Sequence, residues 1–229
     1  MARKGKQVRQ AGADADPAVS PAAPGSDDQR AATRFTLLLR AGKLVSAAGE
    51  YLCILRDASA TGIKAKLFHE LPDQPSFSLE LGNGDAYRVE PVWQREGHAG
   101  FRFADGPIDV HTLMDEGSPF PKRSIRLRLE LPVMVTPDGA ASRLGTLLDL
   151  SQQGGLVEAE PGFALGQQVR LEAPGLPARH ARVRWRRGAA HGLVFQEAFR
   201  LDELALLVHN LQGPGQARPA LQNAQRVNQ

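Results

Sequence analysis

Short runs of alternating apolar and polar residues dominate the middle of the chain. The clearest runs cover residues 127–131, 169–171 and 181–185, and residues 35–39 follow the pattern less strictly because Leu38 is apolar too. A period of two with one apolar face is typical of antiparallel strands that bury one side. Gly, Pro, Asn and Asp residues separate such runs, at 82–84, 137–139 and 174–175. The pattern therefore predicts a mainly β protein with many short strands joined by tight turns.

One stretch near the end of the chain has a different period. Within residues 200–211, apolar side chains recur at helical spacing: Leu201, Leu204, Leu207, Val208 and Leu211. Such a stripe predicts an amphipathic helix. Many short strands followed by one helix favour small β-barrels or sandwiches with a C-terminal helix.

The chain also contains an internal repeat. A shift of 92 residues aligns its two halves without a gap, so that both tryptophans, Trp93 and Trp185, share one register. Self-similarity of this kind indicates two copies of one β-domain. The apolar repeated positions are expected to be core residues, namely the pairs Leu37/Leu129, Leu39/Leu131, Trp93/Trp185 and Phe103/Phe195.

Repeated polar residues are not explained by packing alone. The first copy contains Arg30-Ala-Ala-Thr-Arg34 and Asp57-Ala-Ser-Ala-Thr-Gly62, and the second contains Lys122-Arg-Ser-Ile-Arg126 and Asp149-Leu-Ser-Gln-Gln-Gly154. In order and spacing these motifs resemble those of the PilZ domain family, bacterial receptors for cyclic di-GMP (c-di-GMP). The second copy departs from the family pattern at Lys122, although Arg123 is adjacent.

The resemblance implies a fold and a set of domains. It implies two tandem six-stranded antiparallel β-barrels, with a C-terminal helix after the second and disordered tails. The expected division is a disordered basic and Ala-Pro-rich arm at 1–28, a first barrel at 29–116, a linker at 117–121, a second barrel with its helix at 122–212, and a flexible tail at 213–229.

The resemblance also implies a role for each motif residue. A guanidinium can bind a phosphate or the O6 and N7 atoms of guanine through two bonds, and it can lie flat on a purine. A carboxylate can accept from guanine N–H groups, a serine can donate to an oxygen, and the glycine is expected to allow a tight turn with positive φ and a close backbone approach. The predicted c-di-GMP ligands are Arg30, Arg34, Asp57, Ser59, Gly62, Lys122, Arg123, Arg126, Asp149, Ser151 and Gly154. Asp-x-Ser-x-x-Gly is also good turn chemistry on its own, with Asp and Ser bonding the local backbone.

Composition narrows the function classes. The net charge of +3 is too small for a protein that binds nucleic acid with its whole surface, and no apolar run approaches the roughly 20 residues that span a bilayer. We therefore expect a cytoplasmic protein without membrane insertion. The single Cys53 is expected to be a buried core residue, and no ligand-like cluster of histidines predicts a metal site.

A basic run suggests one further surface. Period two places Arg182, Arg184 and Arg186 on one strand face, opposite Ala181, Val183 and Trp185. That face could be a solvated barrel exterior or a surface for nucleic acid or an acidic partner.

The function expected from these observations is a c-di-GMP receptor without cofactor or enzymatic activity. Ligand binding is expected to change the arrangement of the two domains and their interaction with an unidentified protein partner. Two alternatives are a ligand-independent protein–protein adaptor and a c-di-GMP-responsive DNA-binding regulator. Either copy or both, with one dinucleotide or a stacked pair at a site, fit the sequence, and the expected output is control of motility, biofilm or polysaccharide.

Overall fold

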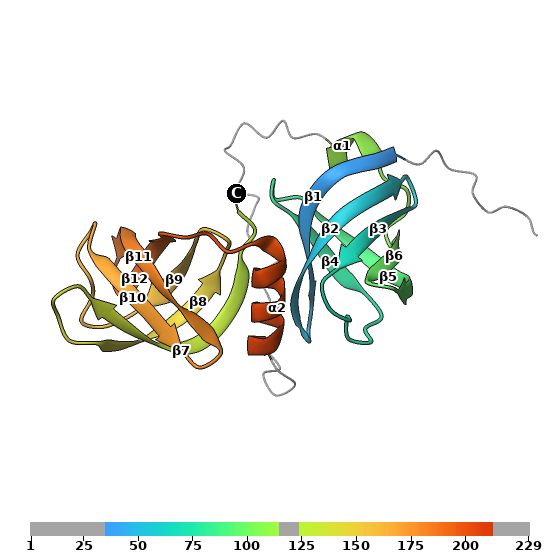
Figure 1. Ribbon diagram of the computed structural model, residues 1–229. Helices are drawn as coiled ribbons and strands as arrows, with labels where there is room; N and C mark the ends of the chain where they lie inside the picture. Colours follow the sequence, from blue (N-terminus) through green and yellow to red (C-terminus); the bar gives the residue numbers. More distant parts are fainter. Residues whose placement is uncertain (1–34, 115–123, 213–229) are drawn as a thin grey trace, which may run out of the picture. The chain divides into compact units, whose positions relative to one another are not determined.

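The computed structural model describes residues 35–114 and 124–212, which form two closed antiparallel barrels of six strands each (Figure 1). A helix follows the second barrel, so the predicted mainly β architecture is confirmed. Arg30, Arg34, Lys122, Arg123, the expected linker at 117–121 and both expected tails lie outside the described residues.

The first barrel has the strand order β1-β2-β3-β6-β5-β4. Its strands are β1 (Phe35–Ser46), β2 (Gly49–Ser59), β3 (Gly62–Leu67), β4 (Phe77–Leu81), β5 (Ala86–Arg95) and β6 (His98–Phe103). A short helix, α1 (Val110–Met114), follows β6 and buries Val110 and Leu113 in the core of this barrel. The sequence pattern did not predict α1.

The second barrel repeats this order as β7-β8-β9-β12-β11-β10. Its strands are β7 (Leu127–Pro137), β8 (Arg143–Leu150), β9 (Gly154–Glu158), β10 (Gln168–Ala173), β11 (Leu176–Arg187) and β12 (Ala190–Phe195). The helix α2 (Leu201–Gln212) buries Leu204, Ala205 and Val208 against this barrel. Leu201, Leu207 and Leu211 are partly buried on the same core, as their spacing predicted.

Each barrel is held together by its own apolar core. In the first barrel, Cys53 is fully buried and burial raises its pKa to about 12, so this thiol stays protonated and packs as a small apolar side chain. In the second barrel, Phe163 and Phe199 are among the largest fully buried side chains. The predicted role of Cys53 is confirmed.

Strand pairing corrects the expectation that the repeat has no gap. In the first barrel Leu55 faces Arg40, whereas in the second the equivalent Leu147 faces Leu131, so the offset between the two strands is 91 here. The irregularity in β1 between Thr36 and Arg40 contains one residue more than the corresponding irregularity in β7. Over β2, β3, β5 and β6 the offset of 92 holds.

Among the described residues, no helix is long and apolar enough to cross a membrane.

Candidate functional site

In the second barrel, the two halves of the predicted motif meet. Arg126 lies just before β7, and its Nη1 donates to Oδ1 of Asp149 near the end of β8 over 2.8 Å. The Arg126 side chain is 50% exposed and that of Asp149 is 15% exposed. Fold and strand pairing thus bring together two residues that lie 23 positions apart in the sequence, at the surface of the barrel.

A β-bulge turns Asp149 toward the outside of the barrel. Leu147 pairs with buried Val157, and Asp149 pairs with Leu156, so Leu148 is an extra residue in β8. Strict alternation would place Leu147 and Asp149 on the same, inner face. One inserted residue moves each following side chain of the strand to the opposite face of the sheet, and β-bulges are known to redirect side chains in this way. The bulge therefore places Asp149 on the outer face of the barrel, where Arg126 covers its carboxylate and leaves the side chain 15% exposed.

A second bulge places Trp185 on the same outer surface. Val183 pairs with Leu193 and Trp185 pairs with Gly192, so Arg184 is the extra residue in β11. Trp185 is 42% exposed, and the equivalent Trp93 is 37% exposed. The expectation that both tryptophans are core residues is wrong, because strict alternation along the strand takes no account of the extra residue in the bulge. In each barrel the indole covers a glycine instead: a Cβ on Gly192 would lie 2.0 Å from Nε1 of Trp185.

Strand register joins these side chains into one row. Asp149 faces Leu156, Leu156 faces Gly192, and Gly192 faces Trp185. Directly opposed residues point to the same side of a sheet. The row begins with an acid that holds Arg126, and the backbone of Trp185 lies roughly 14 Å away, three strand spacings further on. The exposed indole of Trp185 reaches back over Gly192. Between the acid and the indole, the partly exposed Leu156 forms an apolar floor.

The motif serine and glycine shape the turn that follows β8. Ser151 is 2% exposed, and its hydroxyl donates to the carbonyl of Gly154 over 3.0 Å. In the first copy, Ser59 donates to the carbonyl of Gly62 over 3.3 Å. Both hydroxyls therefore serve the local turn chemistry that the sequence allowed as an alternative.

The motif glycines have no positive φ, but they do allow a close backbone approach. Neither Gly62 nor Gly154 is among the described glycines with positive φ, so a left-handed turn is not what requires them. A Cβ on Gly154 would lie 2.0 Å from the carbonyl oxygen of Leu193, and one on Gly62 would lie 2.5 Å from that of Phe101. The glycines allow the paired strand to approach, which was the second half of the expectation.

The first barrel builds the same row with different chemistry. Asp57 faces Lys64, Lys64 faces Gly100, and Gly100 faces Trp93. The floor therefore carries a lysine where the second barrel has Leu156. In addition, the Arg95 guanidinium lies 5.4 Å from the ring centroid of Trp93, so a cation already covers this indole. Arg30 and Arg34, the predicted partners of Asp57, lie outside the described residues.

The basic run of β11 does not form the single face that period two predicts. Arg182 faces exposed Val194, whereas Arg186 faces His191, which is fully buried. The bulge at Arg184 separates the two arginines, so Arg182 shares its face with Trp185 and Arg186 does not. The Nε of Arg186 donates to the carbonyl of Gly188 over 3.3 Å. The surface on which the nucleic-acid alternative depended is therefore divided.

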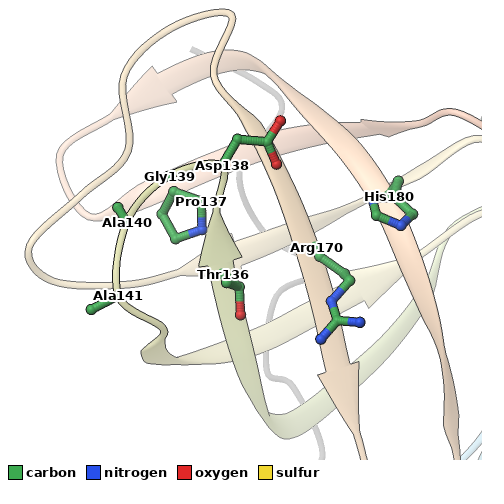
Figure 2. A pocket seen from close by; sticks show the side chains of 8 residues that line it. All are labelled: Thr136, Pro137, Asp138, Gly139, Ala140, Ala141, Arg170 and His180. Atoms are coloured by element: carbon green, nitrogen blue, oxygen red, sulfur yellow. The ribbon is translucent and has the colours of Figure 1, made fainter.

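Other candidate sites are poorer. A shallow hollow of about 590 Å³ lies beside the turn after β7 (Figure 2). Its charged lining includes Asp138 and Arg170, but Arg170 already pairs with Glu172 over 2.7 Å and none of the predicted ligand residues lines it. Within the described ranges, no group of three or more His, Cys, Asp or Glu side chains could hold a metal ion.

Comparisons with known proteins identify the second barrel but not a close relative. A search of curated proteins gives no match. Similar solved structures include PlzA of Borreliella burgdorferi in complex with c-di-GMP (11% identity, 80% of this chain and 94% of that chain, TM-score 0.31) and the Bacillus subtilis inhibitor of motility MotI/DgrA (12%, 76% and 96%, 0.32). MrkH of K. pneumonia in its apo state is another (8%, 75% and 86%, 0.31). These values are too low to support an inference about function.

A family model gives the assignment. The model of the PilZ domain matches residues 121–212, the stretch that contains Arg126, the Asp149 motif, Trp185 and the whole of α2. The second barrel and its helix are thus the part of this chain that matches the PilZ domain.

Proposed function

We propose that this chain is a c-di-GMP receptor and that the ligand binds on the outer row of the second barrel. The observation that carries the proposal is the ion pair between Arg126 and Asp149, which joins the two motif halves on an exposed face of a PilZ domain. The PilZ resemblance supplies the ligand, and the geometry supplies a surface suited to it.

The chemistry of the row matches the parts of a guanine dinucleotide. Arg126 can bind a phosphate or the O6 and N7 edge of guanine with a planar pair of bonds. Asp149 has a second carboxylate oxygen to accept a guanine N–H. The partly exposed Leu156 offers an apolar surface to a flat ring, and the exposed indole of Trp185 offers it a stacking partner.

The other predicted ligand residues complete this proposal. In the second copy, Lys122 and Arg123 would add positive charge next to Arg126, and Ser151 and Gly154 would hold the turn beside the ligand. In the first copy, the proposed ligand residues are Arg30, Arg34, Asp57, Ser59 and Gly62. Lys64 in the floor and Arg95 over Trp93 make the first face more cationic, so we propose that the second face is the better stacking site.

We infer a binding protein rather than an enzyme, located in the cytoplasm. Ligand on the second barrel would change how the two barrels contact each other and thereby the affinity for a protein partner. Such a switch requires c-di-GMP to prefer one arrangement over the other.

Isothermal titration of the full chain with c-di-GMP tests the proposal. Arg126→Ala and Asp149→Asn should each weaken binding by about 10-fold or more, since a hydrogen bond to a charged group contributes about 1.5–3 kcal/mol. Arg170→Ala is the matched control, because Arg170 is 45% exposed and carboxylate-paired like Arg126 but lies away from the row. If the titration shows no binding heat up to high micromolar c-di-GMP, the result favours the ligand-independent adaptor.

A further inference from the structure

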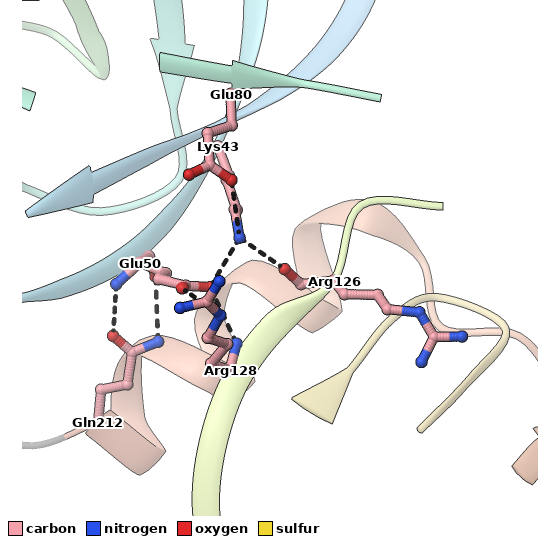
Figure 3. A network of polar contacts seen from close by, with 6 residues as sticks. All are labelled: Lys43, Glu50, Glu80, Arg126, Arg128 and Gln212. Atoms are coloured by element: carbon pink, nitrogen blue, oxygen red, sulfur yellow. Dashed lines mark hydrogen bonds and ion pairs between the residues drawn. The ribbon is translucent and has the colours of Figure 1, made fainter. Parts of the chain in front are cut away.

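A buried carboxylate of the first barrel lies against the beginning of the second. Glu50 in β2 is 5% exposed, and its Oε2 accepts from Nζ of Lys43 over 3.1 Å (Figure 3). The same oxygen accepts from the backbone N–H of Arg128 in β7 over 2.9 Å, and Oε1 lies 3.6 Å from the Arg128 Nε. One side chain thus pairs with a buried lysine and holds the backbone at the beginning of strand β7.

The backbone of Glu50 is held by the end of α2. Its N–H donates to Oε1 of Gln212 over 2.9 Å, and its carbonyl accepts from Nε2 of the same amide over 3.0 Å. Two residues further on, Leu52 is 2% exposed and belongs to the apolar core cluster of the second barrel. A paired amide and a buried leucine therefore add to the contact that the buried Glu50 side chain makes with the second barrel.

The same contact reaches the proposed ligand residue. Nζ of Lys43 donates to the backbone carbonyl of Arg126 over 3.0 Å, and it also pairs with Glu80 over 3.2 Å. Arg128 faces Asp149 in the strand register, next to the row described above. Lys43 and Glu50 thus hold the backbone on both sides of Leu127, where the Arg126 side chain departs toward Asp149.

We propose that Lys43 and Glu50 of the first barrel are positioning residues for the ligand face of the second barrel. The inference rests on the proposed c-di-GMP function. Neither residue touches the outer row, but together they fix the backbone from which Arg126 extends. Without them Arg126 would have to be ordered when the ligand binds, and that entropy would be lost from the affinity. By linkage, bound ligand would strengthen this contact between the barrels to the same degree.

Four variants of the full chain separate positioning from general stability. Glu50→Gln should lower c-di-GMP affinity about 10-fold in calorimetry and speed amide exchange at Arg128 in the ligand-free protein, measured by NMR. Glu80→Gln is the matched control, because Glu80 also pairs with Lys43 but is 39% exposed and has no contact with Arg126 or Arg128 among its ion pairs and hydrogen bonds. It should leave both quantities near wild type.

A double variant provides the sharper test. Lys43→Met combined with Glu50→Gln removes both buried charges, so the melting temperature should recover relative to Glu50→Gln alone. Affinity should stay about 10-fold low, because the carbonyl of Arg126 and the N–H of Arg128 have lost their charged partners. Gln212→Ala loosens the same contact without stranding a charge and should weaken binding several-fold.

The outcomes distinguish the two levels of the argument. A wild-type chain that does not bind c-di-GMP overturns the proposed function and this inference with it. If the wild-type chain binds c-di-GMP and both the Glu50→Gln variant and the double variant bind it equally well, only the positioning role is overturned. Recovery of both melting temperature and affinity in the double variant would assign the pair to stability only.

Discussion

Gly154→Ala should destabilise the second barrel, because a Cβ at this position falls 2.0 Å from the carbonyl oxygen of Leu193. That oxygen belongs to the backbone of β12, which pairs with β9 along five residues, so it cannot rotate away as a side chain would. Forcing extra atoms into a packed site usually costs about 1–3 kcal/mol. A backbone neighbour puts this case at the upper end, about 3 kcal/mol. At a urea slope of about 2 kcal/mol/M, the unfolding midpoint should fall by roughly 1.5 M.

Urea unfolding followed by far-UV circular dichroism measures this effect. Gly62→Ala, with 2.5 Å to the carbonyl of Phe101, should be destabilised less than Gly154→Ala. Gly139→Asn is the control, since Gly139 has φ of 71° and no atom within 4 Å of its ideal Cβ, and asparagine tolerates that conformation. A midpoint for Gly154→Ala equal to wild type would refute the claim that the glycine is required by strand approach.

Three other changes test the site and the core. Trp185→Ala should weaken c-di-GMP binding by about 1–3 kcal/mol in calorimetry, the usual value of base stacking on an aromatic side chain, and an unchanged affinity would contradict a stacking role. Gly192→Ala should lift the indole and red-shift its fluorescence in a Trp93→Phe background, and an unshifted spectrum would show that the indole does not rest on this glycine. His191 is fully buried, and its Nε2 accepts from the N–H of Phe163 over 3.0 Å. Burial lowers the pKa of this imidazole, so the free energy of unfolding should fall as pH drops below about 6.5. His191→Gln should reduce this dependence of stability on pH. An identical slope in that variant would assign the pH dependence to other groups.

The fold could be predicted from the sequence because its strands obey simple rules. Leu127 and Leu129 are buried while Arg128 and Glu130 are exposed, as alternation requires. The predicted turns at 82–84, 137–139 and 174–175 each join two paired strands. Helix α1 was not predicted because five residues are too few to show a helical period. Its place in the fold depends on the burial of Val110 and Leu113 in the core of the first barrel.

The site was less accessible, because its geometry depends on residues that interrupt the alternation. A period of two places Trp185 in the core and Asp149 with Leu147, and one extra residue in each strand reverses both assignments. A usable signal was present in the repeat: each tryptophan is followed seven residues later by a glycine, Gly100 or Gly192. A large residue and a glycine that recur together indicate a cross-strand contact in which the glycine makes room for the ring.

The contact between the barrels uses a surface on which the two copies differ. By strand register, Lys43 and Leu52 of the first barrel occupy the places of Met134 and Leu144 in the second, and both pairs face each other across the first hairpin. Met134 and Leu144 are 40% and 67% exposed, whereas Leu52 is 2% exposed and Lys43 is 7% exposed. A barrel alone gains little from burying a lysine with Glu50, since desolvation offsets the attraction of such a pair. The positioning role proposed above gives the pair a reason, since it holds the strand of the neighbouring domain that begins the proposed ligand face.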